Sequence, residues 1–233
     1  PQGTSDSNQL WLEVTATSGG RVVGRSGGLR RAALEVAPWS HFVNAFVLDR
    51  EGRRVNRRNV QDVFVNLYNH QIPPGAADTV HFLLSIPADV TGPIHVDAAL
   101  RYRKFDTEYM RLVMDDPSWH NDLPILTLAE DRVTLPISGA EGAMGQGEST
   151  IEAWERWNDY GIGLLRKGQL GELRQAAQAF SMVERLGRVE DPAEPVHRLV
   201  VAGRVAGDAV GRQVGGEQRL EVARGDREVH ELA

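Results

Sequence analysis

The residues from Pro93 to Phe105, PIHVDAALRYRKF, alternate apolar and polar side chains with a period of two. Because successive side chains of a β-strand point to opposite faces, Ile94, Val96 and Ala98 share one face and His95 lies on the other. A strand of this kind belongs to an antiparallel sheet with one buried face and one face in water. This pattern limits the chain to folds that bury one side of such a sheet.

Shorter runs of the same kind precede and follow this strand, with turn residues between them. We expect strands, in chain order, at 9–17, 41–49, 53–58, 63–70 and 79–87, and a further strand pair within 123–137. Pro73 and Pro74 end the fourth run because proline fixes φ and donates no hydrogen bond, and Gly75 permits the turn. Six or seven strands at this spacing predict an antiparallel β-sandwich of the immunoglobulin or fibronectin type.

The pattern changes to that of two helices after a stretch of small residues. Trp157, Gly161 and Leu164 recur near the spacing of one helix face, and Gly168 interrupts the pattern before a second helix. The chain is therefore expected to be α+β and multidomain. The expected boundaries are 1–140 for the β-sandwich, 141–150 for a linker, 151–190 for a helical hairpin and 191–233 for a divergent or disordered tail.

Cysteine is absent from the 233 residues, and the formal net charge is -6. Without cysteine the chain can form neither a thiolate metal site nor a covalent c-type haem attachment. The negative charge provides no basic field for nucleic acid, and no apolar run approaches the roughly 18–20 residues of a membrane span. The sequence opens at Pro1 and not at methionine, so we expect a fragment or a mature domain, and the missing signal peptide then carries no information on location.

The helical hairpin resembles one tetratricopeptide repeat, in which small residues allow two helices to approach closely. The matching residues are Trp157, Gly161, Leu164 and Gly168 in the first helix and its turn, and Ala176, Phe180 and Val183 in the second helix. The second set fits only with about three extra residues in the connection. One repeat cannot form a solenoid, because each unit must bury its face on a neighbour.

A wider resemblance covers most of residues 3–190. The stretches that carry it are GTSDSNQLWLEV, GGRVVGRSGG, PWSHFVN, LDREGRRVNRRN, YNHQIPPGAADTVHF, LRYRKFD and RWNDYGIGLL. Together they resemble the C-terminal half of large bacterial multihaem c-type cytochromes with tetratricopeptide tails, of the planctomycete type. In such proteins the CxxCH motifs that bind haem lie upstream of a β-rich module and helical repeats.

The resemblance implies a non-catalytic module that supports electron transfer by packing on the haem domain of the same parent protein. It implies haem c in the upstream part, none bound covalently here, and a periplasmic or otherwise extracytoplasmic location. It also implies that the helical hairpin binds a protein partner. His41, His70 and His81 are the candidate cofactor-binding residues, as distal ligands to haems held elsewhere.

Two readings of these histidines stay open. Adjacent strands around the Pro-Pro-Gly turn would bring His70 and His81 roughly opposite each other, where an imidazole pair could bind a metal or present a haem ligand. The alternative is two ordinary polar strand residues beside a loop. His81 lies on the face away from Val80 and Phe82, so it should face solvent or a neighbouring domain.

Other functions are also compatible with the sequence. The chain could be a stand-alone tetratricopeptide-type interaction module, or a metal-binding β-sandwich that uses the three histidines. The basic cluster RYRK (101–104) is typical of a solvated strand face paired with acids, and alternatively of a docking surface for a haem propionate or an acidic partner. A hydrolase built from Ser40, His41 and Asp49 lacks the GxSxG signature.

Overall fold

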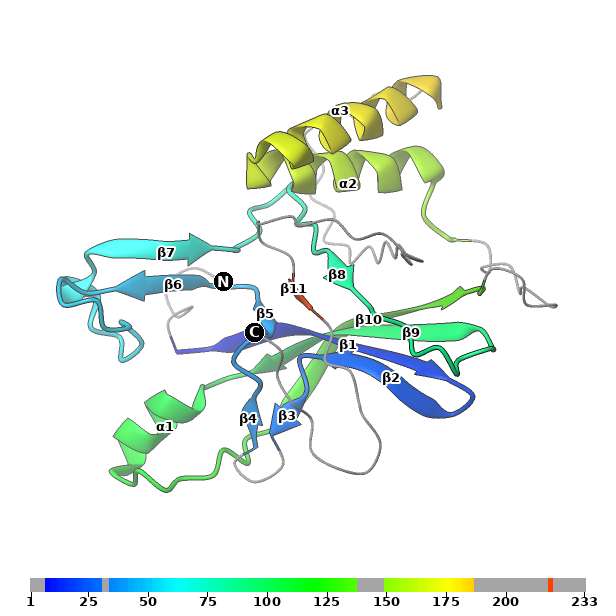
Figure 1. Cartoon of the computed structure of the whole chain (residues 1–233). Coiled ribbons are helices and arrows are strands. Elements are labelled where there is room, and N and C mark those ends of the chain that lie inside the picture. Colours follow the sequence, from blue (N-terminus) through cyan, green and yellow to red (C-terminus); the bar gives the residue numbers. More distant parts are fainter. Residues whose placement is uncertain (1–6, 31–33, 138–148, 187–217, 220–233) are drawn as a thin grey trace.

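The computed structural model of the protein describes residues 7–30, 34–137, 149–186 and 218–219. Its main element is a five-stranded antiparallel sheet in the order β10–β9–β1–β2, with β5 also paired to β1 (Figure 1). These strands are β1 (Gln9–Ser18), β2 (Arg21–Ser26), β5 (His41–Phe42), β9 (Ile94–Arg103) and β10 (Ile125–Leu135). The predicted α+β class and the antiparallel sheet are thus confirmed.

Three pairs of shorter strands lie outside this sheet. They are β3 (Leu29–Arg30) with β4 (Glu35–Val36), β6 (Ala45–Leu48) with β7 (Val65–Asn69), and β8 (Phe82–Leu83) in parallel with β11 (Gln218–Arg219). The strand expected over 41–49 is divided, because β5 joins the main sheet and β6 turns away from it. The strand pair expected within 123–137 is wrong, since β10 is one continuous strand along β9.

The hydrophobic core lies on one face of the main sheet. The buried residues that form it are Leu12, Val14, Ala16, Val23, Leu84, Ile94, Val96, Ala98 and Val133. Val14 lies opposite Ala98 and Ala16 opposite Val96, so β1 and β9 present their apolar faces to the same side. The extended segment 79–87 covers this face, because Val80, Phe82 and Ile86 pack on the core beside Leu84. The period-two alternation predicted for β1, for β9 and for the segment 79–87 is therefore confirmed.

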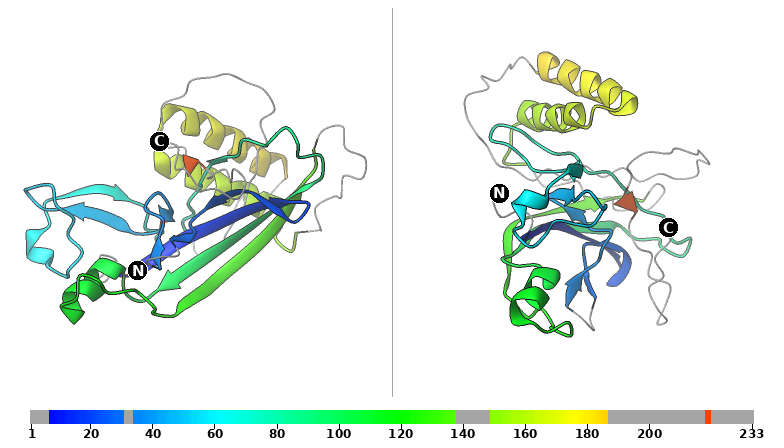
Figure 2. Two further views of the ribbon diagram at one scale, coloured as in Figure 1. Left: turned by 60° about the horizontal axis from the view of Figure 1, so that its bottom comes forward. Right: turned by 90° about the vertical axis from the view of Figure 1, so that its left-hand side faces the viewer.

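The predicted helical hairpin is present as α2 (Ala153–Lys167) and α3 (Leu170–Arg185), which lie side by side (Figures 1 and 2). Gly168 ends α2 in the left-handed conformation at φ 70°, as a C-terminal glycine commonly does. A Cβ on Gly161 would lie 2.8 Å from Cε1 of Phe180, so the helices approach closely at this glycine. The predicted linker and tail fall almost entirely outside the described residues.

The helix α1 (Thr107–Met114) was not expected from the sequence. Asp106 caps it, because its carboxylate accepts a 2.7 Å hydrogen bond from the backbone N–H of Tyr109. Asp115 ends it in the left-handed conformation at φ 53°. A single 3₁₀ turn, η1 (Val60–Asp62), precedes β7. Among the described helices, none has the length and apolar character needed to span a bilayer.

Helix α2 rests on the loop that connects β7 to the core-covering segment. The guanidinium of Arg166 donates hydrogen bonds to the backbone carbonyls of Gln71 (2.6 Å) and Ala77 (2.7 Å). Nearer the start of the helix, the hydroxyl of Thr79 donates to the carbonyl of Tyr160 at 3.3 Å. At Gly163, a Cβ would lie 2.7 Å from the backbone nitrogen of Thr79. The helix thus docks through backbone contacts that a small residue makes possible.

Substitution of Gly163 should test this docking. We expect Gly163→Ala to lower the free energy of unfolding by about 2 kcal/mol, because the new methyl group meets backbone atoms that cannot rotate away. Gly171→Ala is the matched control in α3: nothing lies within 4 Å of its Cβ, so alanine should add about 0.5–1 kcal/mol. Denaturant unfolding measures both. A stabilising Gly163→Ala would contradict the docking.

Candidate functional site

His41 enters the site from the short strand β5. Backbone pairing of β5 with β1 places His41 opposite Leu12, at the edge of the main sheet. Its side chain is 8% exposed, and Nε2 lies 3.0 Å from Oδ2 of Asp78. A buried imidazole in contact with a carboxylate is fixed in orientation, since both rotation and solvation would break the pair.

His70 follows the last residue of β7 and meets His41 face to face. Its backbone N–H donates to the carbonyl of Asn44 at 2.8 Å, which continues the pairing with β6 by one residue. The rings of His70 and His41 are stacked, with centroids 4.6 Å apart and planes 18° apart. Tyr68 stacks on the other side of His70, at 4.5 Å and 20°. Tyr68 and His70 are two residues apart, which places both side chains on one strand face.

The tautomer of neutral His70 follows from its hydrogen bond. Nδ1 lies 3.2 Å from the carbonyl oxygen of Phe42, and a carbonyl can only accept, so Nδ1 carries the proton. Burial lowers the pKa of His70, and the neighbouring His41 lowers it further. Nε2 is then a lone-pair nitrogen, and it has no hydrogen-bond partner in the described part of the chain. This is the arrangement of a metal-ligating histidine, whose other nitrogen donates to a carbonyl.

Asp78 links the histidines to the loop beneath α2. Burial opposes its ionisation, but the hydrogen bond from His41 and the charges of the imidazoles hold the pKa of Asp78 below its usual range. The other carboxylate oxygen accepts the backbone N–H of Thr79 at 2.9 Å. Burial raises the pKa of Tyr68, so this side chain stays a neutral phenol. We call His41, Tyr68, His70 and Asp78 the histidine stack.

The structure groups the predicted histidines differently from the sequence expectation. His70 stacks on His41, whereas His81 lies against Tyr160 of α2, with Nε2 3.5 Å from the phenol oxygen. His81 was expected to face solvent or a neighbouring domain, and its ring lies against the helical hairpin. Sequence reasoning missed Tyr68 and Asp78. The position of Tyr68 two residues before His70 was a usable signal, but nothing in the loop sequence singles out Asp78.

The alternative sites considered from the sequence are not assembled. Within the described ranges, no three His, Cys, Asp or Glu side chains gather as metal ligands would, so the three-histidine metal site is not formed. Nor do the residues of the hydrolase hypothesis meet. The hydroxyl of Ser40 donates to the carbonyl of Ala37 at 2.6 Å, and Asp49 holds the guanidinium of Arg53 at 2.8 Å.

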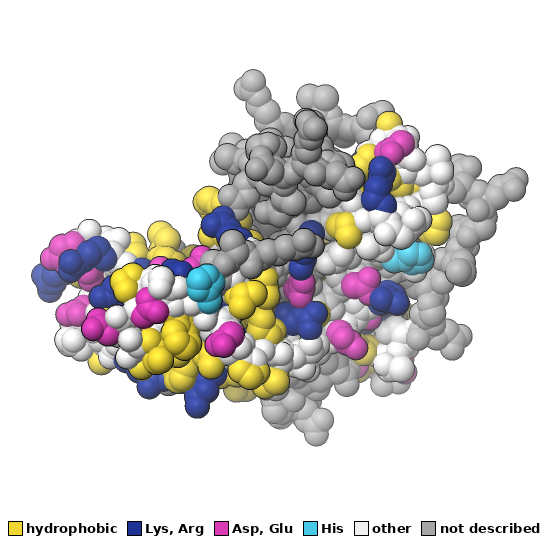
Figure 3. Space-filling view, turned by 90° about the horizontal axis from the view of Figure 1, so that it is seen from below, with side chains coloured by type: hydrophobic (Ala, Val, Ile, Leu, Met, Phe, Trp, Pro, Cys, Tyr) yellow, Lys and Arg dark blue, Asp and Glu magenta, His cyan; other side chains and the backbone are white. Residues whose placement is uncertain are grey.

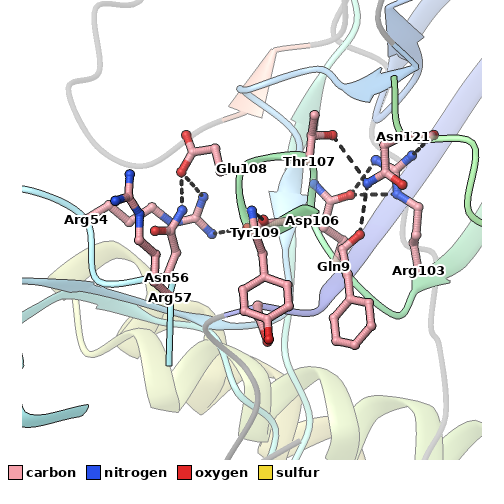
Figure 4. A network of polar contacts seen from close by, with 12 residues as sticks. Gln9, Arg54, Asn56, Arg57, Arg103, Asp106, Thr107, Glu108, Tyr109 and Asn121 are labelled. Atoms are coloured by element: carbon pink, nitrogen blue, oxygen red, sulfur yellow. Dashed lines mark hydrogen bonds and ion pairs between the residues drawn. The ribbon is translucent and has the colours of Figure 1, made fainter. Parts of the chain in front are cut away.

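A second polar cluster, around Arg103 at the end of β9, is structural (Figure 4). Arg103 is fully buried and donates to the side-chain oxygen of Gln9 and to the carbonyls of Leu34 and Asn121. The expectation that the RYRK cluster lies on a solvated face is wrong for Arg103, because these segments cover that end of the strand. It holds for Arg101, which pairs with Glu13 at 2.8 Å and is partly exposed.

Burial of His70 should make stability depend on pH. Because the folded-state pKa lies below the ordinary value of 6.5, the unfolded chain binds more protons between these two values. The stability that neutral His70 contributes is complete above its pKa in the unfolded chain. It is lost as the pH falls through its pKa in the folded protein. We expect His70→Gln to flatten the rise in unfolding free energy as the pH increases toward the ordinary histidine pKa of 6.5.

His120→Gln is the control for this measurement, because His120 is exposed in the loop after α1. Denaturant unfolding at several pH values should give this variant the slope of the unchanged protein. If His70→Gln also kept that slope, the desolvated setting of His70 would be contradicted.

Comparison with known proteins adds little to this geometry. No protein-family model matches the chain, and no curated protein matches it either. One solved structure, a penta-heme cytochrome c552 from Thermochromatium tepidum, is similar over 56% of this chain at 12% identity and a TM-score of 0.32. The chain spans 31% of the length of that cytochrome. A TM-score of this size settles neither fold nor function.

Proposed function

We propose that this chain is a non-catalytic module of a multihaem c-type cytochrome, and that His70 is the histidine it presents to a haem. Seven stretches of sequence resemble that class, from GTSDSNQLWLEV to RWNDYGIGLL. The absence of cysteine means that any haem c is anchored by other residues than those of this chain. An extracytoplasmic location and electron transfer with the haem domain belong to the same proposal.

The observation that carries the proposal is the state of the His70 ring. Three interactions fix the ring: the stacking of Tyr68, the stacking of His41 and the hydrogen bond to Phe42. Its lowered pKa keeps it neutral at neutral pH, as an axial ligand to iron must be. The residues present therefore fit one imidazole ligand to a haem. They supply position and basicity, while the redox chemistry belongs to the haem.

His41 and His81 fit this role less well than His70. Nε2 of His41 lies against the carboxylate of Asp78, and its ring is buried. Nε2 of His81 lies near the phenol of Tyr160, beneath α2. In the proposed module His41 and Asp78 position His70 from one side and Tyr68 positions it from the other. His81 belongs to the contact between the sheet and the helical hairpin.

A haem peptide with one histidine ligand and an open sixth position tests the proposal directly. Titration into the full chain should give the low-spin absorption spectrum of bis-imidazole haem, and His70→Gln should lose it. His120→Gln is the control, because an exposed histidine is the natural competitor for the iron. Low-spin binding that survives in His70→Gln and disappears in His120→Gln would overturn the assignment.

The helical hairpin supplies a second contact surface within the same proposal. The helical hairpin leaves apolar side chains in water, among them Leu165 (53% exposed) and Leu170 (70%). We propose that this face packs on the haem-containing part of the same parent protein. Supplied in trans, that part should bind the unchanged chain, and Leu170→Asp should weaken the binding. Equal binding by both forms would rule out this face.

A further inference from the structure

Strand β7 is the most apolar exposed strand edge in the described part of the chain. The exposed apolar residues in and just before it are Val60, Val63, Phe64, Val65 and Leu67, at 77%, 46%, 61%, 48% and 64%. Phe64 and Val65 are consecutive, so apolar side chains lie on both faces of the strand. A strand that is apolar on both faces normally lies inside a sheet or between layers. Here its position in the fold does not match its composition.

The β6–β7 hairpin projects from the body of the protein (Figures 1 and 2). One edge of β6 is occupied by residues 53–55, since Val55 donates to the carbonyl of Val47 and Asp49 donates to that of Arg53. The other edge of β6 pairs with β7. Among the described strands, β7 pairs with β6 alone, so its second edge is open. So small a sheet with an apolar surface is marginally stable without a further partner.

The open edge lacks two of the features that normally protect an edge strand, although its register with β6 shifts at Leu67, as at a β-bulge. Natural sheets discourage pairing with other chains by placing charged residues or proline on the edge. No Asp, Glu, Lys or Arg occurs between Val63 and Ala77, and the two prolines follow the end of the strand. By contrast, the apolar side chains visible from below are interspersed with charged ones (Figure 3). The β7 edge is therefore suited to strand pairing.

We propose that this edge pairs antiparallel with β7 of a second copy of the chain, about a two-fold axis at Asn66. This register places Val65 opposite Leu67 of the other copy, and Phe64 opposite Tyr68. Asn66 then lies opposite its own counterpart, so amide faces amide, while Val63 lies opposite Asn69. Asp62 lies opposite His70, which introduces no repulsion between like charges. The strand is thus complementary to itself, as a two-fold interface requires.

Among the neighbouring registers, only the one at Asn66 pairs Phe64 with an aromatic residue that is not a histidine. A two-fold axis at Leu67 would place Val65 opposite Asn69 and Phe64 opposite His70, with Leu67 opposite itself. An axis at Val65 would place Val63 opposite Leu67 but Phe64 opposite Asn66. A slip of one residue changes every pair along the strand. The contact is small compared with a standard interface, so we expect a reversible dimer with a Kd on the order of 10 μM.

Sedimentation of the full chain over a concentration series tests for the dimer. The unchanged protein should pass from monomer to dimer, and Leu67→Lys should remain monomeric, because a lysine on the edge opposes pairing. Leu170→Lys, which adds the same charge at an equally exposed leucine of α3, should dimerise normally. A monomer at about ten times the expected Kd would overturn the proposal, and so would a dimer that Leu67→Lys leaves intact.

Single cysteines test the register without background, because the chain contains no cysteine of its own. Directly opposite residues have Cβ atoms about 4.5–5.5 Å apart, so Asn66→Cys should form an intermolecular disulfide under mild oxidation. Val63→Cys is the control on the same edge. In this register the Val63 positions of the two copies lie six residues apart along the strands, roughly 20 Å. Cysteines there cannot form a disulfide. Cross-linking of Asn66→Cys no faster than Val63→Cys would overturn the pairing.

Discussion

Replacement of Gly27 by alanine is expected to lower the free energy of unfolding by about 3 kcal/mol or more. A Cβ at this position would lie 2.2 Å from the carbonyl oxygen of Leu12 and 2.7 Å from Cα of Glu13, both backbone atoms of β1. The carbonyl of Gly27 also accepts a 2.9 Å hydrogen bond from the buried indole of Trp11. The chain can relieve the clash only by separating this turn from β1. Denaturant unfolding measures the loss.

Gly20→Ala is the control that separates the effect of the steric clash on stability from the effect of the left-handed backbone conformation. Both glycines have a left-handed φ, 77° at Gly27 and 78° at Gly20, but nothing lies within 4 Å of a Cβ on Gly20. Alanine there should cost about 1 kcal/mol, which is the penalty for the conformation alone. Equal losses in the two variants would mean that the close approach of Gly27 to β1 does not exist.

Replacement of Arg103 by methionine is expected to cost about 3 kcal/mol, although methionine keeps an unbranched apolar stem. The guanidinium satisfies the buried side chain of Gln9 and the carbonyls of Leu34 and Asn121, and methionine would leave all three without this donor. Burial lowers the pKa of Arg103, because desolvation disfavours the charged guanidinium. Thermal and denaturant unfolding measure the change.

Arg101→Met is the control on the same strand. Arg101 holds Glu13 at 2.8 Å, but both side chains are partly exposed, so the loss should stay below about 1 kcal/mol. Arg103→Lys adds a further test, because lysine keeps the charge and loses the planar fan of donors. We expect it to behave more like Arg103→Met than like the unchanged protein. An Arg103→Lys variant as stable as the unchanged protein would contradict the role assigned to the planar guanidinium.

The candidate site shows where prediction from the sequence stops. His41 and His70 were singled out as imidazoles that could meet a cofactor, and the structure stacks them together. The expected partner of His70 was His81, because the two flank one turn. The structure places His41 there instead, 29 residues earlier in the chain by the numbering, since β5 pairs with β1 and brings it to the end of β7. Such a pairing between distant segments leaves no local pattern.

Helix α1 and Arg103 were missed for related reasons. The helix is only eight residues long and lies between a strand and a turn, so its periodicity is weak. Its one clear signal was Asp106 before an early Glu108, the order that favours a helix start. Arg103 was assigned to a solvated face because it alternates with apolar neighbours. Its burial comes from segments around residues 34 and 121, which no alternation within β9 can reveal.

The sequence by itself determined the local elements. The period-two alternation of β1, β9 and the segment 79–87 and the helical periodicity on either side of Gly168 are properties of neighbouring residues, and each appears in the structure. The absence of cysteine likewise excluded covalent haem without any fold. Only the tertiary structure decided which histidines meet, which arginine is buried and which strand edge stays open, because these depend on contacts between segments far apart in the chain.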